Sequence, residues 1–136
     1  MRYLAVDLGD RRTGLAIGDD ELKMAQPVCV LEISMGPRLI EKILTSLSDQ
    51  DAQALVMGLP LNMDDSASGR VDITNTFVDQ LRQKTDVPIY FQDERLTSVA
   101  AEEHLSQSGK THKQKKKLRD ALAAAEILND FLATLP

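Results

Sequence analysis

The chain has 136 residues, a length typical of one compact domain. Hydrophobic residues make up 43% of it and charged residues 27%, a balance that excludes a disordered, collagen-like or coiled-coil chain. The longest apolar stretch, residues 54–61, is far shorter than the roughly 20 residues of a membrane-spanning helix, and acids follow the N-terminus where a signal peptide would be apolar. We therefore expect a cytoplasmic protein with one domain over residues 1–136 and no membrane partner.

Residues 3–8 and 13–18 are short runs of β-forming residues on either side of the turn GDRR, so they predict a hairpin. Residues 27–33 predict a third strand. Gly36 and Pro37 then begin a helix, because apolar residues recur at every third or fourth position: Leu39, Ile40, Ile43, Leu44 and Leu47.

The rest of the chain alternates strands with helices. Apart from Gln53, residues 53–59 are continuously apolar, as in a strand that is buried on both faces. A helix is expected over about 69–84, a short strand over 88–92, a helix from DERLTS to near Gly109, and a last helix over about 113–132. The expected buried side of the helix over 69–84 consists of Ile73, Phe77, Val78 and Leu81. The aromatic residues of the chain, Tyr90 among them, are also expected mostly in the core. This order predicts an α/β fold with a mixed sheet and helices packed on its faces.

Cysteine and histidine are too scarce for most metal sites. The chain has one cysteine and two histidines. Cys29 has no second cysteine for a disulfide or a zinc site, and His104 and His112 also lack zinc-binding partners. We therefore expect any metal to be held by oxygen atoms, and Cys29 to be a small core residue rather than a nucleophile.

The net charge of −5 would argue against a nucleic-acid partner if it were evenly spread. It is not evenly spread, because residues 110–119 contain no acid and the following basic side chains: Lys110, Lys113, Lys115, Lys116, Lys117 and Arg119. With Arg11 and Arg12, this patch could hold the phosphates of a polynucleotide. A solvated loop is the alternative interpretation of the lysines.

Two aspartates interrupt apolar patterns. Asp7 is expected at the centre of the apolar run of the first strand, where a buried carboxylate must be paired, metal-bound, protonated or at a strand end. Asp120 has only apolar neighbours on its helical face, and small alanines around it would let the helix lie close to the sheet. The alternatives are that Asp7 caps the following turn and that Asp120 forms an ion pair with Arg119 or a lysine.

Asp93 and Glu94 follow the short strand 88–92, where open α/β sheets present the carboxyl ends of their strands to ligands. Successive strand residues face opposite sides, so at most one of the two can join Asp7 and Asp120. The spacing does not decide which one joins them. Three carboxylates from different elements suit Mg²⁺ or Mn²⁺, and two such ions about 4 Å apart can promote phosphodiester hydrolysis.

Four segments carry a resemblance to a known family: VDLGDRRTGLAIGD, VMGLPLNMD, DERLTS and KKKLRDALAAAEIL. In this order they resemble the signature blocks of the YqgF/RuvX family, whose members are described as pre-16S ribosomal RNA nucleases and as Holliday junction resolvases. The resemblance covers nearly the whole chain. One departure is that Asp65 stands where the family has a glycine, and the next glycine is Gly69, so the conformation of the loop after Pro60 is open.

The resemblance implies an RNase H-like fold with a mixed five-stranded sheet flanked by helices. It also implies a catalytic, metal-binding triad at Asp7, Glu94 and Asp120. The substrate-phosphate contacts that it implies are Arg12, Arg95, Lys113, Lys116 and Lys117.

The expected function is therefore a nuclease that depends on Mg²⁺ or Mn²⁺ and processes the 5′ end of precursor 16S rRNA. Two alternatives stay open. A resolvase of branched DNA needs two active sites for its two symmetric nicks, whereas we expect a monomer or a weak homodimer. A module on the same fold could bind nucleic acid without cleaving it, because a fold does not establish an activity.

Overall fold

The computed structural model describes residues 1–59, 68–93 and 112–136, without the side chains of residues 68 and 112–117. Its centre is a five-stranded sheet in the order β3-β2-β1-β4-β5. The strands are β1 (Arg2–Asp7), β2 (Thr13–Asp19), β3 (Ala25–Leu31), β4 (Ala54–Leu59) and β5 (Ile89–Asp93). β2 is antiparallel to β1 and β3, whereas β4 runs parallel to both β1 and β5. The carboxyl ends of β1, β4 and β5 therefore lie at one edge of the sheet.

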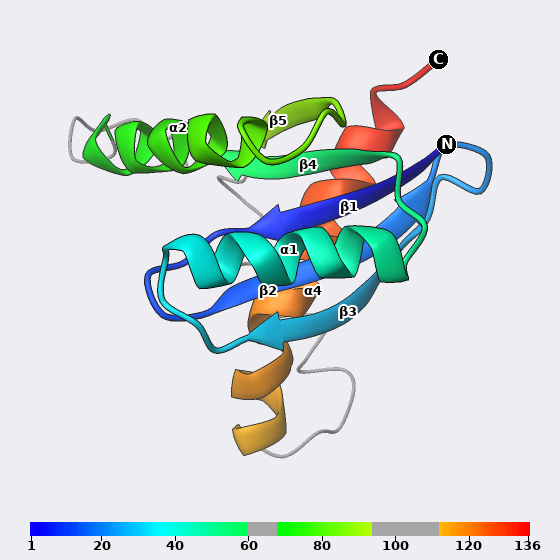
Figure 1. The fold of residues 1–136 in the computed structure, drawn as a ribbon. Helices are drawn as coiled ribbons and strands as arrows, with labels where there is room; N and C mark the ends of the chain where they lie inside the picture. The colour runs from blue at the N-terminus through cyan, green and yellow to red at the C-terminus, as the bar shows by residue number, and fades with distance from the viewer. Residues whose placement is uncertain (60–67, 94–111) are drawn as a thin grey trace.

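Helices cover both faces of this sheet. α1 (Pro37–Asp49) and α2 (Ser68–Arg82) lie in front of the strands in the view of Figure 1, and α4 (His112–Ala133) crosses behind them. The expected α/β fold with a mixed five-stranded sheet is thus confirmed. None of the helices in the described ranges combines the length and the apolar character needed to span a bilayer.

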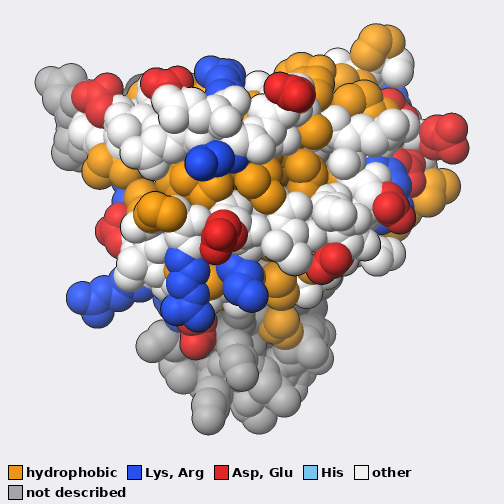
Figure 2. Space-filling model, in the orientation of Figure 1, with side chains coloured by type: hydrophobic (Ala, Val, Ile, Leu, Met, Phe, Trp, Pro, Cys, Tyr) orange, Lys and Arg blue, Asp and Glu red, His pale blue; other side chains and the backbone are white. Residues whose placement is uncertain are grey.

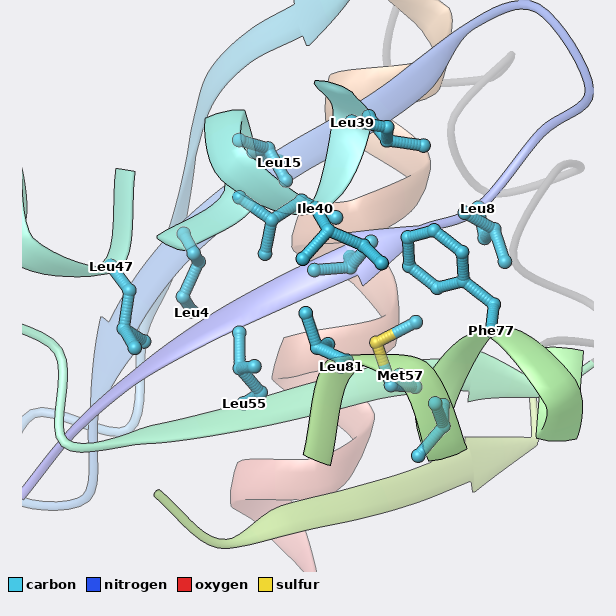
Figure 3. Close-up of a cluster of buried hydrophobic side chains, with 13 residues drawn as sticks. Leu4, Leu8, Leu15, Leu39, Ile40, Leu47, Leu55, Met57, Phe77 and Leu81 are labelled. Carbon is cyan, nitrogen blue, oxygen red and sulfur yellow. The ribbon is translucent and has the colours of Figure 1, made fainter. Parts of the chain in front are cut away.

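The core is divided into two layers by the alternation of side chains along the strands. Leu4 and Val6 of β1 pack beneath α1 and α2, in the larger cluster shown in Figure 3. Tyr3 and Ala5 face the other way and pack against α4. Burying one large apolar side chain contributes roughly 1.5–3 kcal/mol, so these two layers hold the helices on the sheet.

α4 packs on the second face of the sheet through a set of small alanine side chains. Ala121, Ala124 and Ala125 are buried against the sheet. Because these side chains are small, the backbone of the helix can lie close to the sheet. Near the other end of the helix, the ring of Phe131 lies 5.3 Å from that of Tyr3 and 5.4 Å from that of Tyr90, measured between centroids. α4 is therefore anchored along much of its length.

Three expectations need correction. β3 begins at Ala25 rather than at residue 27, because Ala25 pairs with Gly18 and its N–H donates a 2.9 Å hydrogen bond to Asn129 Oδ1. Ile73 was expected on the buried side of α2 but is 46% exposed, because it lines an open groove between α1 and α2. Tyr90 was expected in the core but is 41% exposed, because β5 is an edge strand. The helix expected from DERLTS to Gly109 lies outside the described residues.

Candidate active site

Asp7 is the last residue of β1 rather than a residue within it. Its side chain is half-buried. Strand alternation places it on the same face as Tyr3 and Ala5, which pack against α4. The apolar run that precedes Asp7 therefore delivers a carboxylate to the edge of the sheet, on the face that α4 covers.

Gly14 connects Asp7 to Asp120. Gly14 is the cross-strand partner of Asp7, and it also lies against the main chain of Asp120 and Ala121 on α4. A Cβ at Gly14 would clash with the carbonyl group of Asp120. The helix thus reaches the sheet at the position beside Asp7, so two of the three predicted carboxylate residues lie around one glycine.

The carboxylate of Asp120 is partly buried and has a basic neighbour. Its Oδ2 atom lies 3.4 Å from Nε of Arg12, which comes from the turn after β1. The same Oδ2 atom is buried and has no hydrogen-bond partner among the described residues. An ion pair at Asp120 is thus seen with Arg12, which the β1–β2 turn brings over α4.

The β1–β2 turn that carries Arg12 is held by several contacts. The side chain of Thr13 is fully buried, and its hydroxyl accepts a long, 3.5 Å hydrogen bond from the N–H of Gly9. Arg70 of α2 donates hydrogen bonds to Oδ1 of Asp10 at 2.6 Å and to the main-chain oxygen of Leu8 at 3.0 Å. This turn therefore connects Asp7 to Arg12 and is itself connected to α2.

β5 ends at the same sheet edge, but Asp93 faces away from α4. Asp93 pairs with Leu59, the last residue of β4. On β5, the ring of Tyr90 contacts Phe131 of α4, whereas Phe91 packs in the opposite layer. Alternation places Asp93 on the side of Phe91. Of the two acids at the end of this strand, Asp93 is thus turned away from Asp7 and Asp120.

Several predicted site residues cannot be placed. Glu94 and Arg95 lie outside the described residues, as does the loop after Pro60. Lys113, Lys116 and Lys117 belong to the first turns of α4, but their side chains are not described. Arg12 is exposed beside Asp120, and Arg11 is exposed next to it. The structure therefore brings together Asp7, Arg12 and Asp120 from the predicted set.

These residues fit a hard divalent cation in part. Carboxylate oxygens are the ligands that Mg²⁺ and Mn²⁺ prefer, and the buried Oδ2 atom of Asp120 is an acceptor that lacks a hydrogen bond. No group of three acidic, histidine or cysteine side chains suited to a metal occurs within the described part of the chain. The predicted third ligand, Glu94, lies outside that part.

Cys29 lies away from this site, on β3. It is half-buried and packs against the core beneath α1, as expected for a small core residue. Burial raises the pKa of its thiol, which keeps the sulfur protonated near neutral pH. Its environment is that of a structural cysteine rather than of a nucleophile.

Two residues at this site were not expected from the sequence. Gly14 lies in the second strand, where a glycine within a strand could have signalled a close backbone approach. Arg70 is one of several charged residues on α2, and nothing in the sequence distinguishes it. Its role depends on contacts with Asp10 and Leu8, which lie 60 and 62 positions earlier in the chain.

Similar solved structures define the fold class. Thermus thermophilus RuvC bound to a Holliday junction substrate matches with a TM-score of 0.59 at 18% identity, covering 97% of this chain and 94% of that one. The fowlpox virus Holliday junction resolvase matches with a TM-score of 0.61 at 12% identity, covering 99% of this chain and all of the other. The protein therefore has the RNase H-like fold of these resolvases.

The sequence comparisons give the family. The family model described as "RuvX: Holliday junction resolvase" matches residues 1–134. Proteins named "Putative pre-16S rRNA nuclease" from Roseiflexus sp. (strain RS-1) and Anaeromyxobacter sp. (strain Fw109-5) are 38% and 37% identical to this chain. These matches cover 96% and 97% of this chain and 93% and 96% of the relatives. The chain belongs to the RuvX family.

Proposed function

We propose that this protein is a nuclease that uses Mg²⁺ or Mn²⁺ to hydrolyse phosphodiester bonds and that it processes the 5′ end of precursor 16S rRNA in the cytoplasm. Asp7, Glu94 and Asp120 are the proposed catalytic and metal-binding residues. Family membership supports the reaction class, and the names of the relatives support the substrate.

One observation carries the proposal. Asp120 of α4 lies against Gly14, the cross-strand partner of Asp7. This arrangement brings together acids from two elements that are far apart in the sequence, at the edge where β5 also ends. A purely structural acid is expected to have its buried oxygens hydrogen-bonded, whereas Oδ2 of Asp120 has no such partner in the described part of the chain.

Each residue has a proposed part in the reaction. The carboxylates of Asp7, Glu94 and Asp120 would hold the cation, which when bound supplies charge neutralisation and activation of water. Arg12 is exposed beside Asp120, so its guanidinium can bind a substrate phosphate next to the reacting group. Arg95, Lys113, Lys116 and Lys117 are proposed to bind flanking phosphates of the RNA backbone.

The decisive experiment is cleavage of an end-labelled precursor 16S rRNA fragment by protein freed of contaminating nucleases. Asp7→Asn and Asp120→Asn should each abolish cleavage while RNA binding is retained, and chelation should abolish wild-type cleavage. Asp79→Asn is the control, because Asp79 is 73% exposed on α2, on the other face of the sheet. Cleavage by the Asp7→Asn variant at the wild-type rate would contradict the proposal.

Resolution of branched DNA is the second candidate, and the family description together with the two resolvase structures favours it. A four-way DNA junction should be assayed in parallel with the RNA. Symmetric nicking of the junction without RNA cleavage would establish this alternative. Because two nicks need two sites, sedimentation should then show a dimer on the junction. Binding of either substrate without cleavage of either would favour a non-catalytic module.

A further inference from the structure

We propose that Arg70 of α2 is a positioning residue that fixes the turn between Asp7 and Arg12. The inference rests on the proposed nuclease function for its catalytic consequence. Arg70 belongs to α2, which covers the face of the sheet opposite α4 (Figure 1), and it is neither one of the predicted triad nor one of the predicted phosphate contacts. Its importance comes from its two hydrogen bonds, which both reach the turn between Asp7 and Arg12.

Arg70 holds the turn at two points. One guanidinium nitrogen of Arg70 lies 2.6 Å from Oδ1 of Asp10, and the other lies 3.0 Å from the main-chain oxygen of Leu8. Leu8 directly follows Asp7, and Asp10 is two residues before Arg12. A planar guanidinium that is hydrogen-bonded to two points of one turn restricts both the position and the orientation of that turn.

Other contacts also hold the turn. The N–H of Gly9 donates a hydrogen bond to the Thr13 hydroxyl, and at 3.5 Å this bond is long. The main chain between these residues packs tightly, because a Cβ on Gly9 would clash with the carbonyl oxygen of Arg12. The turn thus has a compact shape and a long hydrogen bond of its own, and Arg70 supplies two shorter bonds from outside.

The charge of Arg70 is paired with the exposed carboxylate of Asp10. Arg70 lies near the start of α2, where a positive charge is disfavoured by the helix dipole. The carboxylate of Asp10 offsets this charge, but its side chain is 78% exposed, so solvent screens the attraction. The bond to the partly buried oxygen of Leu8 is therefore expected to matter more for position than the ion pair does.

The consequence is a connection between α2 and the candidate site. α2 is held on the sheet by the buried side chains of Phe77, Val78 and Leu81. Through Arg70 it also fixes the segment that ends β1 and carries Arg12 over Asp120. Small displacements of catalytic groups have large effects on rate. Loss of the Arg70 hydrogen bonds should therefore lower the turnover rate more than it weakens substrate binding.

The experiment compares Arg70→Ala with Arg70→Lys, Asp10→Ala and Arg82→Ala. Arg82 is the matched control, because it lies on the same helix in an exposed pair with Asp79 at 3.9 Å. Arg70→Ala should lower kcat by about 10- to 100-fold and weaken Mn²⁺ binding by a similar factor. KM should stay within about twofold, because the lost interaction orients the site rather than binds substrate. Arg70→Lys should recover part of the loss, Asp10→Ala should have a smaller effect, and Arg82→Ala should match the wild type.

Amide hydrogen exchange of residues 8–13 is a readout that needs neither substrate nor metal. Exchange in this turn should accelerate in Arg70→Ala and not in Arg82→Ala, at temperatures equally far below each Tm. Unchanged exchange, or kcat equal to the wild type, would overturn the inference. If the wild-type protein cleaves nothing, the proposed function fails, while the exchange measurement still decides whether Arg70 holds the turn.

Discussion

Gly14 of β2 lies in direct contact with the main chain of Asp120 on α4, and there is no room between them for a side chain. The Cβ of an alanine at this position would clash with the Asp120 carbonyl and come within 2.7 Å of the nitrogen of Ala121. Because Gly14 also pairs with Asp7, the same contact that docks the helix sets the spacing of the two acids.

Gly14→Ala should therefore damage both stability and activity. The new methyl group meets backbone rather than a flexible side chain, so α4 must move away. We expect a loss of about 1–3 kcal/mol in the free energy of unfolding, measured by urea denaturation. Nuclease activity should fall further than stability predicts, because Asp120 moves with the helix.

Gly69→Ala is the matched control for Gly14→Ala. Among the residues that the structure describes, none has an atom within 4 Å of the position that its Cβ would occupy, and Gly69 is in a helix. The free energy of unfolding should be unchanged or rise by up to about 1 kcal/mol. An equal loss of stability in both alanine variants would show that the close contact with α4 is not the cause.

Arg12→Gln tests two effects of Arg12 separately: its charge beside Asp120, and its proposed contact with a substrate phosphate. Removing a positive charge 3.4 Å from Asp120 should strengthen Mn²⁺ binding by calorimetry. We expect a change of about two- to fivefold, since the pair is partly exposed and screened. The affinity for RNA should fall in the same variant, with a weaker dependence on salt. Weaker Mn²⁺ binding in Arg12→Gln would contradict the idea that Arg12 and the cation oppose each other at Asp120.

Leu55→Ala tests the layer of core beneath α1 and α2. Leu55 is fully buried in β4, so its truncation should cost about 2–5 kcal/mol. Ile73→Ala should cost far less, because Ile73 is 46% exposed in the groove between α1 and α2, where Figure 2 shows a strip of hydrophobic side chains. Thermal unfolding of both variants would show whether Ile73 contributes to the core.

The thiol of Cys29 should react slowly with an alkylating reagent. Burial raises its pKa, so the folded protein has less reactive thiolate at pH 8 than the unfolded chain. The rate should rise with pH as the raised pKa is approached, and it should reach that of an ordinary thiol in denaturant. Equal rates with and without denaturant would show that Cys29 is open to solvent.

Much of the fold could be predicted because local pattern and tertiary structure agree. The helix over Pro37–Asp49 begins where predicted, and the buried strand over Ala54–Leu59 lies within one residue of its predicted bounds. Ile73 was misjudged because the helical repeat places it near Phe77 but does not reveal that no element covers it in the described part of the chain. Periodicity gives the direction of a side chain, whereas burial depends on what lies opposite.

The candidate site was only partly predictable, for a related reason. Asp7 and Asp120 stood out because each interrupts an apolar pattern, and a carboxylate among apolar neighbours needs an explanation. Gly14 and Arg70 interrupt no pattern, and their importance comes from contacts with distant parts of the chain. Asp93 and Glu94 could not be separated by spacing, and the structure resolves one half of the question by turning Asp93 away.

The close docking of α4 on Gly14 also has a consequence for folding. Contacts between segments so far apart in sequence slow folding, and a helix at a chain end can open locally. A chain whose last helix has not docked lacks Asp120 beside Asp7. Under the proposed function, such an immature or frayed molecule would be harmless to RNA, so the helix contact would act as a safeguard that permits cleavage only by completely folded protein.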